Sequence, residues 1–327
     1  MEAIKMNKRA LIVGIDRYDT YPPLSAAVSD AEAMADILSK NGDGSPNFGC
    51  RLLTSPGREA VTRANLRRNW RELFDGFRGD VLFYFSGHGA PTEVGGFLAT
   101  QDAAEDDPGL AMEELVNMAN NSAAKTVLLI LDCCFSGSAG NPAALRNGNI
   151  ENKAILREGV TILSASRPAE LSYEVGGHGV FSNLILGALK GGAANVRGHI
   201  SAAAIYAYVE AALGPWDQRP LYKSHAEHLE PVRTVPPMVS DELLREMTTF
   251  FPAQDHRYSL NETYEETSDK AKPENVIIFK KFKRLQIAGL LRPDNGSDLY
   301  WVAIEGRSVV LTDLGIFYYQ LIRKHLI

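Results

Sequence analysis

Two apolar runs in this chain each stop at a small, glycine-containing turn that carries one reactive side chain. Residues 80–85 run into the turn 86–89 (SGHG), and residues 126–131 run into the turn 132–137 (DCCFSG). In an α/β sheet, ligands bind and chemistry occurs in the crevice outside the carboxyl ends of the parallel strands. Two adjacent parallel strands would therefore place an imidazole beside a thiol, which is the pair that catalysis by a cysteine nucleophile requires.

The composition is that of a globular protein and indicates no attraction to a strongly charged partner. The chain has 327 residues, of which 45% are hydrophobic, and a net charge of −6, so no chain-wide positive field attracts nucleic acid or anionic membrane. Two of its three cysteines are adjacent, which disfavours a disulfide framework and favours a reducing compartment. The first apolar run is too short for a membrane span and reads as a strand rather than a signal peptide. We therefore expect a cytoplasmic protein without membrane contact.

The order of the elements predicts an α/β fold followed by a second domain. From residue 8 onward strand-like and helix-like segments alternate, which favours a mainly parallel sheet with helices on both faces. The segment 231–237 contains three prolines and predicts a linker. We expect a first domain at residues 1–230 and a second at residues 238–327.

The second domain has a different pattern. Apolar spacing predicts helices at 241–250, 274–291 and 313–327, and a β-hairpin formed by residues 299–304 and 308–311. Helix, helix, hairpin and helix is the order of a winged helix, a small α+β domain.

Basic residues on the second predicted helix of this domain have two interpretations. Cations that face the phosphates would give salt-dependent DNA binding, whereas cations on an amphipathic helix are often only its solvated face. The neighbouring acidic stretch 261–269 argues against a broad phosphate-binding surface, so we favour a protein-docking or adaptor role. The candidate DNA- or partner-binding residues are Lys280, Lys281, Lys283, Arg284 and, at the expected wing tip, Arg307.

The two reactive turns assign chemical roles to their residues. A cysteine attacks a carbonyl group only as the thiolate and therefore needs a nearby base. His88 supplies that base and later protonates the leaving amine. The glycines of the same turn let the backbone approach the reacting carbonyl, and the N–H group at Gly89 is the candidate oxyanion donor.

Five stretches of the sequence resemble the caspase-like peptidase family, in the family's order. They are RALIVGIDRY, LSAAVSDAEAM, FYFSGHG, LLILDCCFSG, and LSASRPAELSYE with the following GHGVFSNLILGAL. The chain is more similar to the bacterial and metacaspase branches than to animal caspases, and the resemblance covers about residues 8–225. It implies a sheet of about six mainly parallel strands with helices on both faces, and cysteine endopeptidase activity.

The resemblance also indicates which cysteine is the nucleophile. The second cysteine of the family's motif is catalytic, which corresponds to Cys134; Cys133 is the alternative, and the strand points it the other way. Phe135 stands where many metacaspases have histidine, and this departure leaves His88 as the base.

Substrate specificity follows from acidic residues at the family's pocket positions. These positions correspond to Asp30 and Asp132, with Ser86 lining the same pocket. A confined carboxylate discriminates in favour of a basic side chain, so the resemblance implies protein substrates cleaved after arginine or lysine and not after aspartate. The alternative for Asp30 is an ordinary solvated residue near a helix start.

The resemblance further implies regulation by proteolysis. The polar segment 138–158 corresponds to the linker that is cut when caspase-like enzymes mature, and exposed loops of this kind are common cleavage sites. Family relatives of this size often act in stress or antiviral defence, after an upstream protease or sensor is triggered. We therefore expect a zymogen-like effector whose candidate processing sites are Arg146, Lys153 and Arg157.

Three further features have weaker interpretations. Calcium binds acidic loops in some metacaspases, but a solvated loop is the favoured reading here, so we expect no metal or other cofactor. His178 lies in a GGHG segment that mimics the SGHG turn without a preceding apolar run, and we interpret it as a loop histidine. The competing functional class is a DNA-binding or adaptor protein whose caspase-like domain acts as a sensing or partner-specific module. The acidic loop considered above for calcium contains Asp102, Glu105, Asp106 and Asp107.

Overall fold

The computed structural model describes residues 7–92, 95–133, 156–165, 174–175, 177–213, 220–225, 230–296 and 298–327. The chain divides into two compact units, the first comprising Met1–Ala194 with His199–Val235 and the second Asn195–Gly198 with Pro236–Ile327. Each unit has its own hydrophobic core. Among the described helices, none combines the length and the apolar character needed to span a bilayer.

A six-stranded sheet forms the centre of the first unit. Its strands follow the order β12-β8-β7-β3-β1-β2, and only the edge strand β12 runs antiparallel to its neighbour. This sheet confirms the predicted α/β fold with mainly parallel strands. The strands are β1 (Lys8–Ile15), β2 (Gly49–Ser55), β3 (Asp80–Ser86), β7 (Thr126–Asp132), β8 (Val160–Ser164) and β12 (Leu221–His225).

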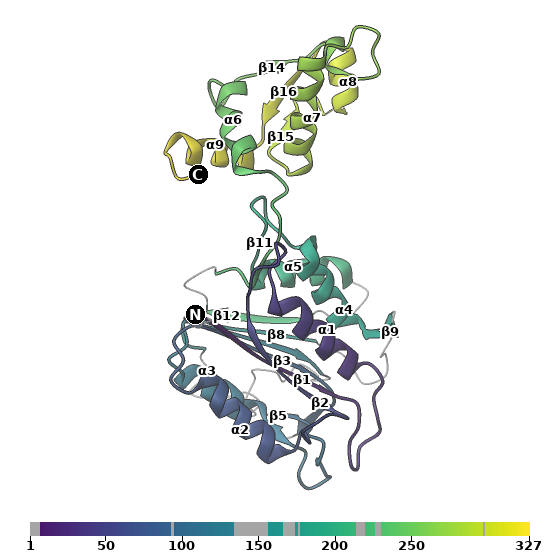
Figure 1. Ribbon diagram of the computed structural model, residues 1–327, viewed down its shortest axis with the longest axis vertical. Coiled ribbons are helices and arrows are strands. Elements are labelled where there is room, and N and C mark those ends of the chain that lie inside the picture. The colour runs from purple at the N-terminus through teal and green to yellow at the C-terminus, as the bar shows by residue number, and fades with distance from the viewer. Residues whose placement is uncertain are drawn as a thin grey trace, which may run out of the picture. The chain divides into compact units, whose positions relative to one another are not determined.

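Helices cover both faces of the sheet, as Figure 1 shows. Side chains alternate along each strand, so every central strand contributes to both layers. On β3, for example, Phe83 packs with Trp70 of α2 in one core, whereas Tyr84 packs in the opposite core with Met34 of α1. The helices are α2 (Arg63–Phe74) and α3 (Met112–Asn121) on one face, and α1 (Ala27–Ser39), α4 (Val180–Gly187) and α5 (Ala202–Leu213) on the other.

The position of α1 depends on two residues at the end of β1. A Cβ atom at Gly14 would lie 2.2 Å from the carbonyl oxygen of Ala27, so only glycine allows the helix to approach this closely. Asp16 then accepts hydrogen bonds from the backbone N–H groups of Ala27 (2.8 Å) and Val28 (3.3 Å). A carboxylate stabilises the start of a helix in this way. The first turn of α1, which carries Asp30, is therefore fixed at the carboxyl edge of the sheet.

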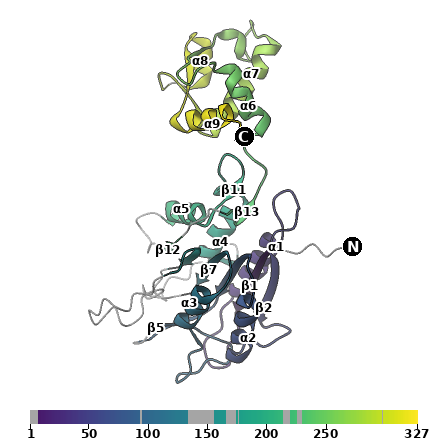
Figure 2. The ribbon, with the colours of Figure 1, turned by 90° about the vertical axis from the view of Figure 1, so that its left-hand side faces the viewer.

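Several short strands around the sheet were not predicted. Each is two to four residues long, which is too short to show a period-two pattern. These short strands are the three-stranded sheet β4 (Gly89–Thr92), β5 (Gly95–Leu98) and β6 (Leu110–Ala111), and the pairs β9 (Glu174–Val175) with β10 (His178–Gly179) and β11 (His199–Ile200) with β13 (Arg233–Thr234). Figure 2 shows β5, β11 and β13 from a second direction.

The second unit contains helices and a small sheet with the strand order β14-β16-β15. Its first helix has the predicted bounds, whereas α7 ends earlier than predicted, before Gly289, which adopts a φ of +73°. The elements are α6 (Asp241–Phe250), β14 (Tyr258–Ser259), α7 (Pro273–Ile287), β15 (Leu291–Pro293), α8 (Leu299–Ile304), β16 (Ser308–Leu311) and α9 (Asp313–Arg323).

The predicted hairpin in this unit is wrong. Residues 299–304 form the helix α8, and β16 pairs with β14 and β15. The side chain of Asp298 accepts a hydrogen bond from the backbone N–H group of Tyr300 (2.8 Å) and caps the helix. Leu299, Val302 and Ala303 are buried at helical spacing. One of the elements on which the winged-helix prediction rested is therefore a helix.

Candidate active site

The register of the sheet brings the two reactive turns to one edge. Ser86, the last residue of β3, pairs with Asp132, the last residue of β7. His88 follows β3 by two residues in the sequence, and Cys134 follows β7 by two residues, so the last residues of the two strands that lead to them are paired. Cys134 itself lies outside the described residues.

The loop after β1 fixes the position of His88. The backbone N–H group of His88 donates to the Tyr18 hydroxyl (2.7 Å), and the two rings lie 4.9 Å apart between centroids. The imidazole Nε2 atom lies 2.9 Å from the carbonyl oxygen of Pro22. Because a carbonyl oxygen only accepts, Nε2 carries the proton and donates it. In the neutral imidazole, Nδ1 is then the nitrogen that can act as a base.

Tyr18 is a partly buried contributor that the sequence analysis did not single out. Burial raises the pKa of the Tyr18 phenol well above its ordinary value, so this side chain stays neutral. A Cβ atom at Gly87 would lie 2.6 Å from the Tyr18 hydroxyl oxygen, so the glycine of the SGHG turn makes room for this contact. The only sign of Tyr18 in the sequence was its place in the RALIVGIDRY stretch.

The two adjacent cysteines are not equivalent. Cys133 is 4% exposed and packs in the core between the sheet and the layer of α2 and α3. An apolar environment disfavours the thiolate, so this burial argues against Cys133 as a nucleophile.

The two predicted pocket acids lie on either side of Gly179. Asp30, only 1% exposed, accepts from His178 Nδ1 (2.7 Å) and from the backbone N–H group of Gly179 (3.2 Å). Asp132 accepts from the Ser182 hydroxyl (2.6 Å) and backbone N–H group (3.2 Å). A Cβ atom at Gly179 would lie 3.1 Å from a carboxylate oxygen of each acid. The structure thus brings together two carboxylates that are far apart in the sequence.

This pair concentrates negative charge in a buried place. Burial, and then the charge of Asp132, raise the pKa of Asp30 from 3.8 to about 6, against the opposing hydrogen bonds from His178 and Gly179. Tyr84 lies beneath the pair, and its hydroxyl is bonded to that of Ser182. Burial and the same two carboxylates raise the pKa of Tyr84 well above its ordinary value. A site with this charge favours a cation over a neutral or anionic group.

The remaining predicted residues of the first unit have different surroundings. Ser86 is buried and hydrogen-bonded to Tyr84, and Gly89 begins β4, opposite Leu98. Arg157 donates to the carbonyl oxygens of Ala119 and Ala124, among others, and so holds the end of α3. Two further candidate processing residues, Arg146 and Lys153, lie outside the described residues.

The acidic loop is partly engaged by the start of α2. Asp102 accepts from the backbone N–H group of Arg63 (2.9 Å) and from the Thr100 hydroxyl (2.7 Å), and Asp107 forms an ion pair with the Arg63 side chain. In the part of the chain that the structure describes, no three His, Cys, Asp or Glu side chains are grouped so that they could hold a metal ion.

The three lysines at 280, 281 and 283 of α7 form ion pairs within the second unit, and Arg284 on the same helix is exposed. An acidic partner close to a cation reduces the positive potential that attracts a phosphate backbone. Arg307, at the turn before β16, is likewise paired with Glu305 (2.7 Å). The pairs on α7 are Lys280 with Glu266 (2.9 Å), Lys281 with Glu246 (2.5 Å) and Lys283 with Glu265 (3.5 Å).

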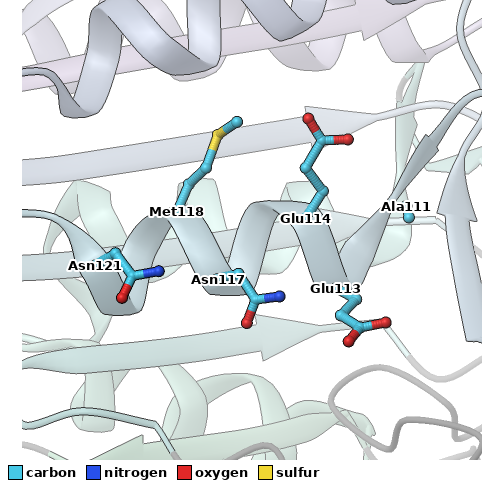
Figure 3. A pocket seen from close by; sticks show the side chains of 6 residues that line it. All are labelled: Ala111, Glu113, Glu114, Asn117, Met118 and Asn121. Atoms are coloured by element: carbon cyan, nitrogen blue, oxygen red, sulfur yellow. The ribbon is translucent and has the colours of Figure 1, made fainter.

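An open pocket of about 500 Å³ lies along α3, as Figure 3 shows. Glu114, one of its lining residues, is held by Arg67 through two hydrogen bonds of 2.7 and 2.9 Å. None of the predicted site residues that the structure describes lines this pocket, and α3 packs on the face of the sheet opposite to α1 and α4. The candidate site is therefore defined by the strand ends.

Comparisons with known proteins agree with this fold. A family model described as the caspase domain matches residues 7–230, and no curated protein matches the sequence significantly. Protein GSU0716 from Geobacter sulfurreducens has a similar structure (TM-score 0.51, 19% identity, 70% of this chain and 99% of that chain). Caspase-1 from Spodoptera frugiperda is also similar (TM-score 0.50, 14% identity, 71% and 91%). These structural likenesses show the fold, and the family model covers more than half of the sequence: the chain belongs to the caspase-domain family, peptidase C14.

Proposed function

We propose that this protein is a cysteine endopeptidase that cleaves after arginine or lysine, with Cys134 as the nucleophile and His88 as the general base. Membership of the caspase-domain family supports a cysteine peptidase with protein substrates. The observation that carries the proposed dyad is the pairing of Ser86 with Asp132, because it starts both reactive turns at one level of the sheet.

The proposed mechanism uses the tautomer that Pro22 favours. Nδ1 of His88 takes the proton of the Cys134 thiol, and the thiolate attacks the substrate carbonyl carbon. The N–H group at Gly89 is the proposed donor to the oxyanion that forms. When the C–N bond breaks, the His88 imidazolium gives its proton to the leaving amine. Water, deprotonated by the same imidazole, then hydrolyses the thioester and releases the acid.

The pair of carboxylates supports a basic residue at P1, the substrate residue before the cleaved bond. A guanidinium or ammonium group beside Asp30 and Asp132 would offset part of their negative charge in a confined place, where charge-assisted hydrogen bonds are strong. An acidic P1 side chain would instead add a third negative charge.

The test is hydrolysis of short fluorogenic peptides that end in arginine, lysine or aspartate, with and without calcium. Turnover of the arginine or lysine peptides alone is the expected result. Turnover of aspartate peptides would overturn the pocket assignment and keep the dyad. Absence of turnover by both intact chain and protein nicked within the 138–158 segment would overturn the peptidase proposal.

Replacing Tyr18 with phenylalanine is expected to lower kcat/KM on these peptides about fivefold, because a hydrogen bond contributes roughly 1 kcal/mol and this one fixes the His88 backbone. The expected change is in kcat rather than in KM. Tyr21→Phe is the matched control, since Tyr21 also lies near the His88 ring, at 6.1 Å between centroids. Equal effects of the two substitutions would contradict a specific role for the Tyr18 hydroxyl.

Regulation is part of the proposal. Cleavage at Arg146 or Lys153, by the enzyme itself or by an upstream protease, would convert a zymogen-like chain into the active form. Arg157 is a poorer site, because its guanidinium group is already bound to several acceptors around the end of α3. By analogy with family members, we place the enzyme as a cytoplasmic effector in a bacterial stress or antiviral defence pathway.

The second unit could bind either a protein partner or DNA, and its ion pairs favour the protein partner. The salt bridges of Lys280, Lys281 and Lys283 support a docking or adaptor role over DNA binding. Binding of the full chain to random duplex DNA, measured at several salt concentrations, separates the two: a strong salt dependence would indicate phosphate contacts.

A further inference from the structure

His178 contacts one of the two pocket acids, although its sequence context gave it no role. Its Nδ1 atom lies 2.7 Å from Oδ1 of Asp30, and its side chain is 28% exposed while that of Asp30 is 2% exposed. The following residue, Gly179, binds the other oxygen of Asp30. The turn before it is also tied to α1, because the Ser29 hydroxyl donates to the carbonyl oxygen of Gly177 (2.9 Å).

Both oxygens of Asp30 are therefore already bound by the short strand β10. A basic substrate side chain that enters beside Gly179 would meet Asp132 on one side, and Asp30 with its histidine partner on the other. A neutral imidazole there donates a hydrogen bond to Asp30 and adds no charge. An imidazolium is a second cation within a few ångströms of the incoming one, and like charges at that separation repel.

We propose that His178 is a specificity-determining residue that, when protonated, takes the place of the substrate's basic side chain at Asp30. The proposal rests on the proposed function, because it assumes that the basic side chain enters between Asp30 and Asp132. The consequence is a proton-controlled affinity: basic substrates bind less tightly when the His178 imidazole carries its second proton.

Other groups that titrate near His178 must be separated from it. Asp30 of α1 and Asp132 of β7 face the pocket, Tyr84 of β3 lies beneath it, and Glu174 of β9 pairs with Gly179 in the backbone register. The raised pKa of Asp30, about 6, means that its own protonation also weakens cation binding in this range. Removing His178 also removes a hydrogen bond that holds the pKa of Asp30 down, so the sign of the change in KM is what separates the two groups.

The two roles open to His178 predict opposite changes. If the imidazolium competes with the substrate, its removal lowers KM at acid pH. If His178 instead serves to keep Asp30 ionised, its removal raises KM, because the hydrogen bond that favours the carboxylate is lost. The sign of the change in KM therefore decides between them.

The experiment measures kcat and KM for an arginine peptide at pH 6 and pH 8 with wild type, His178→Ala and His178→Gln. Glutamine keeps a hydrogen-bond donor but cannot be protonated. We expect both variants to lower KM about tenfold at pH 6, to match wild type at pH 8, and to leave kcat unchanged. His325→Ala, at an exposed histidine of the second unit, is the control. An unchanged or raised KM at pH 6 would overturn the proposal.

Binding of benzamidine, an amidinium probe, gives a readout that needs no turnover. Calorimetry with the same variants is expected to show about tenfold tighter binding at pH 6 for His178→Ala and His178→Gln, and no binding of neutral benzamide. If no basic peptide is cleaved but this difference is observed, the proposed peptidase specificity fails and the role of His178 stands. Equal benzamidine affinities, or no binding to any variant, would overturn the role of His178.

Discussion

Replacing His88 with alanine is expected to lower kcat/KM on arginine peptides about 1,000-fold, and replacing Cys134 with alanine is expected to reduce it to background. A general base contributes roughly 10² to 10⁴ in rate, and the covalent route disappears without its nucleophile. Neither substitution removes a residue from the sheet, since both positions follow the strand ends. The measurement is steady-state hydrolysis of the same fluorogenic peptides.

Cys133→Ala is the matched control for Cys134→Ala. It makes the same chemical change one residue earlier, at a thiol that is buried in the core. We expect nearly full activity from this variant and a modest loss of stability from the cavity it creates. An inactive Cys133→Ala together with an active Cys134→Ala would reverse the assignment of the nucleophile.

The architecture of the first unit was accessible from the sequence because its central elements are long. A strand such as β3 has a run of buried residues, and helices such as α2 repeat apolar residues over several turns. The short strands β9 and β10 give no such pattern, since the pairing of Gly179 with Glu174 depends on tertiary contacts. The strand predicted at residues 299–304 was wrong for a related reason. Their β-branched and aromatic residues favour a strand, but the cap at Asp298 stabilises a helix.

The candidate site also contains some residues that the sequence could predict and others that it could not. Asp132 is the last residue of β7 and the reactive residues come directly after strands, so their common edge could be predicted from the alternation of elements alone. Asp30 was found through the resemblance to metacaspases, since nothing in a helix start by itself indicates a pocket. His178 and Ser182 were missed because their contacts with Asp30 and Asp132 join residues about 150 and 50 positions apart, which no local pattern encodes.

Replacing Asp30 with asparagine is expected to make the protein more stable at neutral pH and much less active. Folding raises the pKa of Asp30 from 3.8 to about 6, so the folded state disfavours the carboxylate that neutral pH requires. The stability that Asp30 contributes is fully present below pH 4 and is lost as the pH rises through 6. The loss corresponds to roughly 3 kcal/mol at pH 8, and asparagine, which can still accept from Gly179, avoids most of it.

Activity should change in the opposite direction, because the charge that destabilises the fold is the one proposed to bind the substrate. Loss of one partner of a buried, hydrogen-bonded charge pair costs about 2 to 5 kcal/mol, so kcat/KM on arginine peptides should fall by about 30-fold or more, mainly through KM. Urea unfolding at pH 4, 6 and 8 and peptide hydrolysis test the two effects on one variant. Asp36→Asn, which makes the same change on the exposed face of α1, should alter neither. If the variant is more stable but fully active on arginine peptides, Asp30 does not bind the substrate, and the substrate's cation binds elsewhere.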